Sequence, residues 1–453
     1  MANPMFVLDE HMMELIFDYC HRRLALDLVA LDFGGARETF DDVLSGLIGE
    51  TGHDPGAVLT VFTDHLAKAV ISCDSPRFLS FIPAAPTKAA LLFDMIVSCS
   101  SLAGTSWLEA AGAVAAENQV LGFLAELAGL PPGAGGCFVS GGSIANHSAL
   151  VVARDTTETR RHAVPGRARI AVSEEAHASV EKALRILCVE PFVVPVVDHR
   201  LTGDALQGAL DRSGEGSDDV IGVVATAGTT NAGIVDDLDG IGTIARERSL
   251  WFHVDAAYGG AGLFTPLVRD RYAGIEHADS IVIDPHKWLY APFDCAALVY
   301  REPALARAVH SQKASYLDVI HDDANPVWNP SDYAVHLTRR ARGLPLWFSL
   351  AVYGAGAYRQ AVETVLDTAW RSAALIEATP YLELAREPEL SIVLFRRVGW
   401  EAPDCRRWSD RLLAAQVGFV TPSSWEGAPV ARLAFLHPGT TLEMIAEIVA
   451  TMA

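Results

Sequence analysis

Hydrophobic and polar positions change their spacing along the chain and divide it into three zones. In residues 1–75, apolar side chains recur at helical spacing and β-branched runs are few. The positions concerned are Met13, Leu15, Ile16, Tyr19, Leu59, Phe62, Leu66 and Val70. This pattern predicts a helical N-terminal arm that is too short to be a full domain.

Residues 76–344 alternate short apolar runs with helix-like segments. The runs are RIAVS at 169, FVVPVV at 192, VIGVVATAG at 220, WFHVDAAY at 251, SIVID at 280 and AALVY at 296. Such alternation is typical of βαβ units. We therefore expect an α/β fold whose large domain contains a central, mostly parallel sheet.

Residues 345–453 predict a small C-terminal α+β domain. A helical segment, LWFSLAVYGAGAYRQAVETVLDTA, is followed by the strand-like runs SIVLFRRV, QVGFVT and VARLAFLH and by a closing helix, LEMIAEIVATM. Upstream of this zone, the polar stretch HDDANPVWNPSDY at 321–333 carries two prolines and is expected to be a loop.

Composition narrows the classes of protein. The 453 residues allow two or three structural units, and the formal net charge of -21 disfavours nucleic acid and anionic membranes as partners. The seven cysteines include no C-x-x-C pair, which argues against a disulfide framework or a zinc site. No basic region precedes an apolar core at the N-terminus, and no apolar run reaches the ~20 residues of a membrane span, so a cytoplasmic location is expected.

Candidate chemistry lies after the strands, because ligands of α/β sheets bind beyond the carboxyl ends of the strands. The run CFV is followed by SGGSIAN, where Gly142 and Ser143 precede a helix. Glycines let the backbone approach an anion, and a helix start offers unpaired N–H groups, so a phosphate would fit. A tight turn with a serine cap is the alternative interpretation.

Three further strand ends carry reactive groups. His177 follows RIAVS and is either a helix cap or a functional group. Asp255 directly follows a buried strand and needs either an arginine or a ligand with a protonated nitrogen. Lys287, between His286 and Trp288, is either a surface lysine or a partly desolvated one, and desolvation would favour the neutral amine that attacks carbonyls.

Pyridoxal 5'-phosphate requires four features together. They are a phosphate-binding turn, a histidine that stacks on the ring, a carboxylate for the pyridinium nitrogen and a lysine that forms a Schiff base. The matching stretches are SPRFLSFIP at 75, SGGSIAN at 140, AHASVEKA at 176, TAGTTNAGIVDDL at 226, HVDAAYGG at 253, DPHKW at 284 and RRARGLPLW at 339. On these residues the chain resembles the group II pyridoxal-phosphate amino acid decarboxylases, the family of aromatic L-amino acid, glutamate and diaminobutyrate decarboxylases. The resemblance runs from about residue 74 to 360 and implies fold type I, which is aspartate aminotransferase-like.

The resemblance also implies cofactor-binding roles. They fall on Gly142, Ser143, His177, Thr226, Asp255, Ala257, His286 and Lys287. Gly142 and Ser143 match the phosphate site, His177 the residue that stacks on the ring, Asp255 the partner of the ring nitrogen and Lys287 the residue that holds the aldehyde. Thr226 and Ala257 match the pair that flanks the ring, and His286 matches a histidine near the phosphate or the imine.

Tyr316 matches the catalytic tyrosine of a mobile loop that, in this family, covers the active site of the neighbouring subunit. The resemblance therefore implies a homodimer with shared active sites. It also implies that Tyr316 protonates the quinonoid left after carbon dioxide departs, which favours an amine product over an aldehyde.

The substrate is the least determined property. Positions that match the substrate pocket of aromatic-specific relatives are Phe78, Phe81, Ile82, Pro83 and Trp107, and their apolar character favours an aromatic L-amino acid. Arg77 and Lys88 keep an acidic substrate open, and a diamino acid substrate and an aldehyde synthase activity are further alternatives. A transaminase or carbon-sulfur lyase, or a metal-binding protein that uses His253, Asp255 and His286, is less favoured.

Three residues depart from the family pattern. Ile144 stands where relatives often carry an acidic residue, Asp284 stands where asparagine is frequent, and Pro345 falls in a stretch that relatives keep helical. We expect none of them to touch the cofactor residues. In the loosely matching C-terminal part, Arg432 is either an arginine on the carboxylate side of the substrate or a structural one.

Overall fold

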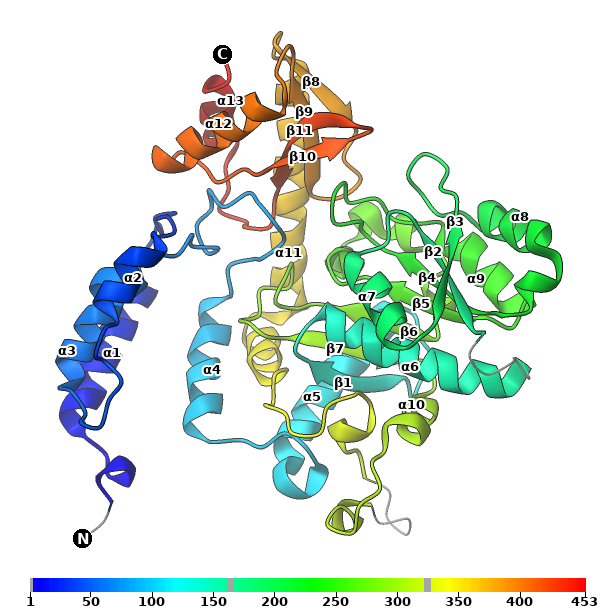
Figure 1. Ribbon diagram of the computed structural model, residues 1–453, viewed down its shortest axis with the longest axis horizontal. Helices are drawn as coiled ribbons and strands as arrows, with labels where there is room; N and C mark the ends of the chain where they lie inside the picture. Colours follow the sequence, from blue (N-terminus) through cyan, green and yellow to red (C-terminus); the bar gives the residue numbers. More distant parts are fainter. Residues whose placement is uncertain (1–2, 162–166, 322–326) are drawn as a thin grey trace.

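A seven-stranded sheet lies at the centre of the computed structural model, which describes residues 3–161, 167–321 and 327–453 (Figure 1). The strand order is β1-β7-β6-β5-β4-β2-β3. The strands are β1 (Gly135–Val139), β2 (Arg169–Ser173), β3 (Glu190–Val194), β4 (Val220–Thr226), β5 (Trp251–Asp255), β6 (Ser280–Ile283) and β7 (Ala296–Tyr300). Only β7 runs antiparallel to its neighbours, so the predicted α/β class with a mostly parallel sheet is confirmed.

Helices cover both faces of this sheet. One face packs against α6 (Gly142–Arg161), α7 (Ala178–Ile186) and α10 (Pro303–His310). The other packs against α5 (Trp107–Leu127), α8 (Gly203–Ser213) and α9 (Leu238–Glu247). Successive residues of a strand point to opposite faces, so Ala297 and Val299 of β7 join one core while Leu298 and Tyr300 join the other. This burial on both faces explains why the strands read as continuous apolar runs.

The C-terminal part forms a second, four-stranded antiparallel sheet, which the long helix α11 (Leu344–Glu377) connects to the first (Figure 1). Its order is β10-β11-β9-β8, and its elements are β8 (Leu382–Arg386), β9 (Ile392–Arg397), α12 (Ala402–Ala414), β10 (Pro422–Trp425), β11 (Ala428–Ala434) and α13 (Leu442–Ala450). The prediction of a strand at QVGFVT is wrong. The backbone of Phe419 pairs instead with Arg77 and Leu79, far away in the sequence, and β10 begins only at Pro422.

The N-terminal arm is helical, as predicted. It contains α1 (Glu10–Leu24), α2 (Arg37–Val43), α3 (Pro55–Val61) and a π-helix over Phe62–Leu66. None of α1, α2 and α3 contains a buried residue. Figure 1 shows the arm beside α4 (Lys88–Cys99) and apart from both sheets. Within the described ranges, no helix has the length and apolar character needed to span a membrane.

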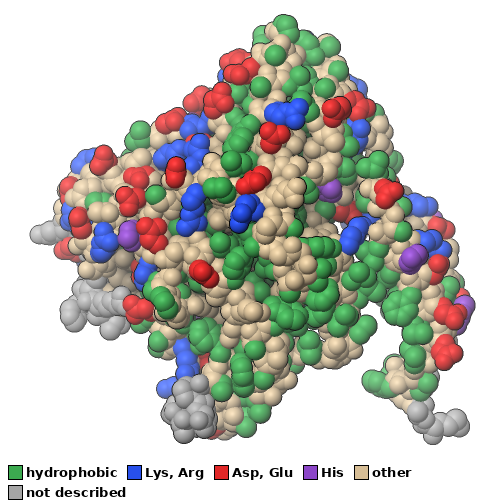
Figure 2. All heavy atoms as spheres, turned by 180° about the vertical axis from the view of Figure 1, so that it is seen from behind, with side chains coloured by type: hydrophobic (Ala, Val, Ile, Leu, Met, Phe, Trp, Pro, Cys, Tyr) green, Lys and Arg blue, Asp and Glu red, His purple; other side chains and the backbone are tan. Residues whose placement is uncertain are grey.

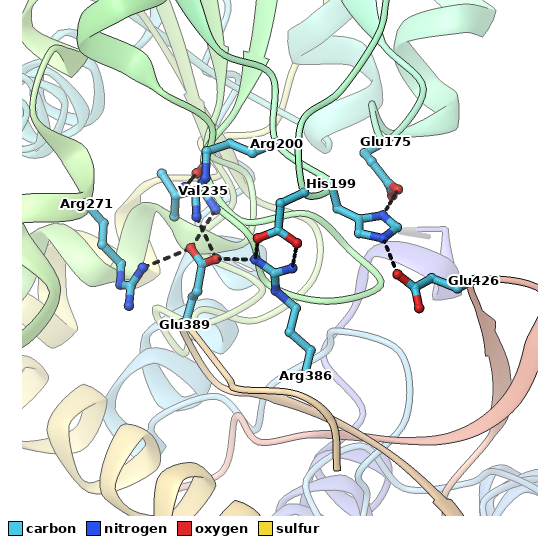
Figure 3. Close-up of polar contacts among 9 residues, drawn as sticks. Glu175, His199, Arg200, Val235, Arg271, Arg386, Glu389 and Glu426 are labelled. Carbon is cyan, nitrogen blue, oxygen red and sulfur yellow. Dashed lines mark hydrogen bonds and ion pairs between the residues drawn. The ribbon is translucent and has the colours of Figure 1, made fainter. Parts of the chain in front are cut away.

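A polar cluster joins the two sheets around the buried carboxylate of Glu389 (Figure 3). Arg200 and Arg386 contact one oxygen of Glu389 at 2.7 and 3.2 Å, and Arg271 contacts the other at 3.0 Å. The backbone N–H of Val235 also donates to this carboxylate, at 3.4 Å. Glu389 therefore holds segments of the large domain against the loop between β8 and β9.

Removing the charge of Glu389 is expected to destabilise the protein. Glu389→Gln keeps the shape of the side chain but leaves the surrounding arginines without their shared anion, which costs about 3 kcal/mol by analogy with broken buried ion pairs. The measurement is the urea midpoint of unfolding. Asp367→Asn, at the exposed Arg371–Asp367 pair, is the control and is expected to cost less than about 1 kcal/mol. Equal midpoints for the two variants would contradict this account.

Candidate active site

The site begins where β1 ends and α6 starts. Gly142 opens the helix at a point where a larger residue has no room: a Cβ atom there would lie 2.9 Å from Asp284 Oδ2 and 3.3 Å from Ala257 Cβ. The backbone N–H of Gly142 donates to Asp284 Oδ2 at 3.1 Å. The first turn of α6 thus presents N–H groups and the positive end of the helix dipole to the adjoining cavity.

Lys287 lies in the turn that follows β6. Its Nζ atom is 3.1 Å from Asp284 Oδ2. Burial alone would lower the pKa of Lys287, but the charges of Asp284 and Asp255 outweigh it and raise that pKa above its ordinary value. The expectation that desolvation favours the neutral amine is therefore wrong for this structure, because a carboxylate lies against the ammonium group.

Asp284 itself corrects a second expectation, since this departure from the family pattern lies among the candidate cofactor residues. Its side chain is 2% exposed, and Oδ2 contacts Lys287, Gly142 and, at 3.7 Å, His286 Nε2. Its other oxygen, Oδ1, is buried without a hydrogen-bond partner in the described part of the chain. Burial lowers the pKa of His286, whose Nδ1 accepts a hydrogen bond from the Cys295 N–H at 3.0 Å.

Asp255, at the end of β5, is a buried carboxylate held by amides. Its Oδ2 accepts from Asn146 Nδ2 at 2.8 Å, and its Oδ1 accepts from the backbone N–H of Ala257 at 3.1 Å. Among the described residues no arginine, lysine or histidine forms an ion pair with it, which disfavours the interpretation of Asp255 as one half of a salt bridge. The carboxylate is left free to face a cation in the cavity.

A chain of hydrogen bonds behind Asp255 fixes the orientation of Asn146. His253 Nε2 lies 2.9 Å from Asn146 Oδ1, and His253 Nδ1 lies 2.8 Å from Ser280 Oγ. Trp251 Nε1 donates to the same Ser280 oxygen at 2.9 Å. Burial lowers the pKa of His253 to about 4, so its ring is neutral at neutral pH. Because Asn146 Nδ2 donates to Asp255, Asn146 Oδ1 faces His253, and the tautomer that fits this contact carries its proton on Nε2.

His177 is both a helix cap and a cavity residue. Its Nδ1 accepts from the backbone N–H of Ser179 at 3.2 Å, at the start of α7. Two residues earlier, Glu175 bonds His199 at 2.8 Å, and Glu426 approaches the other side of that ring at 3.3 Å (Figure 3). Burial opposes protonation of His199, but the two carboxylates prevail and raise its pKa. This contact ties the His177 segment to the small domain.

These groups line one cavity of about 280 Å³. All eight predicted cofactor residues line it, namely Gly142, Ser143, His177, Thr226, Asp255, Ala257, His286 and Lys287. Sequence reasoning missed the lining residues Gly141, Asn146, Ser179, Gly228, Thr230, Tyr258 and Asp284. All of them fall inside the motifs quoted above. Their position at or after the end of a strand is the sequence feature that could have identified them. Within the described ranges, no group of His, Cys, Asp and Glu side chains is arranged to hold a metal ion.

The predicted substrate residues and Tyr316 are not among the lining residues. Phe78 is buried and packs edge-on against Phe419 at 5.1 Å, whereas Phe81 is 60% exposed. Ile82 and Pro83 continue that segment, and Trp107 begins α5. Tyr316 is 69% exposed. Part of the predicted 321–333 loop, residues 322–326, lies outside the described residues.

Arg432 of β11 is buried, and its guanidinium donates to three backbone carbonyls, those of Thr230, Asn231 and Phe81. Burial lowers its pKa to about 10. It forms no ion pair with a carboxylate of the described chain. The contacts show a structural arginine that ties the segment 230–231, which borders the cavity, to the small sheet.

Comparison with known proteins identifies the family. Residues 51–398 match the model described as the pyridoxal-dependent decarboxylase conserved domain. The chain belongs to the group II pyridoxal-dependent decarboxylase family. This decarboxylase is a carboxy-lyase that acts on an amino acid and uses pyridoxal phosphate.

Two curated relatives illustrate the similarity. The decarboxylase is 28% identical over 416 residues to the aromatic-L-amino-acid decarboxylase of Bacillus atrophaeus, covering 89% of this chain and 86% of that protein. It is 32% identical over 431 residues to the L-2,4-diaminobutyrate decarboxylase of Rhizobium meliloti (strain 1021), covering 92% and 84%. The structure of Oryza sativa TDC with PLP and tryptamine shares the fold, with a TM-score of 0.88 at 23% identity over 98% of this chain and 96% of that one.

The residues of the cavity fit this cofactor. Gly142 brings the start of α6, with the positive end of its dipole, to the cavity wall, Asp255 faces the cavity without a cationic partner among the described residues, and Lys287 supplies an amine in the same space. These are the features that a phosphate, a protonated ring nitrogen and an aldehyde need, namely a positive helix end, a hydrogen-bond acceptor and an amine.

Asn146 is expected to matter for turnover although it was not a predicted site residue. Asn146→Ala removes one donor to Asp255 and leaves the N–H of His253 unpaired, so kcat should fall about 10- to 100-fold, the equivalent of the roughly 1–3 kcal/mol that an unpaired buried polar group costs. Cofactor affinity, measured by equilibrium dialysis, should change less. Gln207→Ala, which removes an exposed amide bonded to Asp211, is the control. An unchanged kcat in Asn146→Ala would contradict the role.

Proposed function

We propose that this decarboxylase converts an aromatic L-amino acid to its amine and carbon dioxide. The observation that carries the proposal is the presence, in one cavity, of a lysine amine and of a buried carboxylate that no described cation neutralises. Lys287 would bind the cofactor through its aldehyde, and Asp255 would face the ring nitrogen. The first turn of α6, at Gly142 and Ser143, receives the phosphate.

The residues of the chain set the chemistry that the cofactor supplies, which is an electron sink for the bond broken at Cα. Asp255 keeps a proton at the ring nitrogen, because its carboxylate is buried and held in place by Asn146 and the Ala257 N–H. His177, Thr226 and Ala257 also line the cavity. There, His177 would stack on the ring, and Thr226 and Ala257 would flank it. His286, whose Nε2 lies 3.7 Å from Asp284 Oδ2, would lie near the phosphate.

The aromatic preference rests on the apolar character of the segment around Phe78 and Phe81 and on the Bacillus relative. The identity to the diaminobutyrate decarboxylase supports a diamino acid as the second candidate. An acidic side chain would need a cation, and Arg77, one candidate, is already engaged with Glu447 at 2.7 Å. The cytoplasmic location stays a prediction from the sequence.

Release of carbon dioxide across the proteinogenic amino acids, with diaminobutyrate and ornithine added, tests the substrate. We expect the highest kcat/KM for an aromatic substrate, by analogy with the aromatic-L-amino-acid decarboxylase of Bacillus atrophaeus. Lys287→Ala is expected to abolish both turnover and the yellow colour of the bound cofactor. A preference for a diamino or acidic substrate would overturn the aromatic assignment, and turnover by Lys287→Ala would overturn the site.

Tyr316 is proposed to act in the neighbouring subunit of a homodimer. It is largely exposed and lies outside the cavity of its own chain. Apolar surface suited to self-association is present on the arm, where Met12 and Ile16 are exposed, and on α4, where Leu92 and Ile96 are exposed. Figure 2 shows the arm standing off from the body of the molecule, with hydrophobic side chains exposed on both.

The proton at Cα of the product is proposed to come from Tyr316. Tyr316→Phe is then expected to release carbon dioxide but to form aldehyde, ammonia and hydrogen peroxide from amino acid, oxygen and water, because the carbanion is oxidised before it is protonated. Amine, aldehyde and oxygen consumption are measured together. An unchanged amine yield would show that another group donates the proton.

Mixing the two variants separates a shared site from an internal one. A heterodimer of Lys287→Ala and Tyr316→Phe subunits contains one intact site only if Tyr316 serves the partner subunit. Random mixing of two-fold dimers should then restore about a quarter of wild-type amine formation. No restoration by subunits that do exchange would contradict a shared site.

A further inference from the structure

Asp284 contacts the groups that the proposed function assigns to the cofactor. Its Oδ2 lies 3.1 Å from Lys287 Nζ, which would carry the aldehyde, and accepts from the Gly142 N–H, which would bind the phosphate. His286 Nε2 lies 3.7 Å from the same oxygen. One carboxylate oxygen of Asp284 thus contacts both the Lys287 amine and the Gly142 N–H.

The other oxygen of Asp284 indicates that this carboxylate is not placed to stabilise the fold. Oδ1 is buried and has no hydrogen-bond partner among the residues that the structure describes, and the side chain is 2% exposed. An unpaired buried polar atom is unfavourable and is often found where a ligand or catalytic group acts. An asparagine, frequent at this position in the resembling family, would present a donor and no charge.

We propose that Asp284 is an internal competitor of the cofactor phosphate, which holds Lys287 and the start of α6 in the cofactor-free enzyme and weakens the uptake of pyridoxal phosphate. The inference rests on the proposed roles of Lys287 and Gly142. A phosphate group carries close to two negative charges at neutral pH, so it must enter beside a buried carboxylate of like sign. Repulsion between the phosphate and the Asp284 carboxylate would be substantial, because water screens charges poorly in a buried site.

Under this proposal, the charge of Asp284 sets the affinity of the enzyme for pyridoxal phosphate. Asp284→Asn preserves the size of the side chain and an oxygen that can accept from Gly142, and it removes the charge. The expected gain in affinity is selective for ligands that carry the phosphate, since pyridoxal has the same ring and aldehyde without it. Loss of the ion pair with Lys287 affects both ligands, so the difference between them reports the phosphate alone.

The test uses the full chain, freed of cofactor with hydroxylamine and reloaded with pyridoxal phosphate or pyridoxal. Dissociation constants are measured by equilibrium dialysis. Asp284→Asn is expected to bind pyridoxal phosphate at least ~10-fold more tightly than wild type, with a smaller change for pyridoxal. Asp294→Asn is the matched control, because this carboxylate is in the same segment but is 44% exposed and paired with Arg342 at 2.7 Å. It should leave both constants unchanged.

Equal or weaker binding of pyridoxal phosphate by Asp284→Asn, or equal gains for both ligands, would overturn the proposal. Asp284→Ser removes the same charge with a smaller side chain and must shift the affinity for pyridoxal phosphate in the same direction. Thermal unfolding of both cofactor-free variants checks that they are folded. Failure of the proposed function looks different, because the wild type would then form no yellow adduct at Lys287.

Discussion

Charge buried at the carboxyl ends of β5 and β6 is the constraint on which the active site depends. Asp255 and Asp284 both lie almost entirely out of solvent, and a buried carboxylate is costly unless it is hydrogen-bonded or paired. Asp255 accepts hydrogen bonds from amide groups, whereas Asp284 forms an ion pair with the ammonium group of Lys287. The cavity is therefore polarised, with an amide-bonded carboxylate at Asp255 and an ion pair at Asp284 and Lys287.

The parallel sheet brings these charges together and the layer behind them keeps them there. Asn146 comes from α6, His253 from β5 and Ser280 from β6, and their hydrogen bonds cross three elements that are far apart in sequence. Because each donor has a definite acceptor, rotation of Asp255 would leave several buried groups unpaired. Such support is what a binding site requires to hold its geometry.

The small domain contributes position rather than reactive groups to the cavity. Arg432 holds the carbonyls of Thr230 and Asn231, and Glu389 binds the Val235 N–H together with arginines of the large domain. His199, between two carboxylates, adds a third link near the segment of His177. Through these contacts, residues about 200 positions away in the sequence hold the cavity wall in place.

The sequence by itself determined the α/β class and the strands of the large sheet, and it selected eight candidate cofactor residues that line one cavity, because apolar runs and the residues that follow them are local features. Only the tertiary structure decided that Phe419 pairs with residues near Phe78, that Lys287 is held as an ammonium and that Asp284 enters the cofactor site. The contact between Gly142 and Asp284 joins positions 142 residues apart. No local period records such a contact, since it depends on how β1 and β6 are ordered in the sheet and on which charge lacks water once the helices close over them.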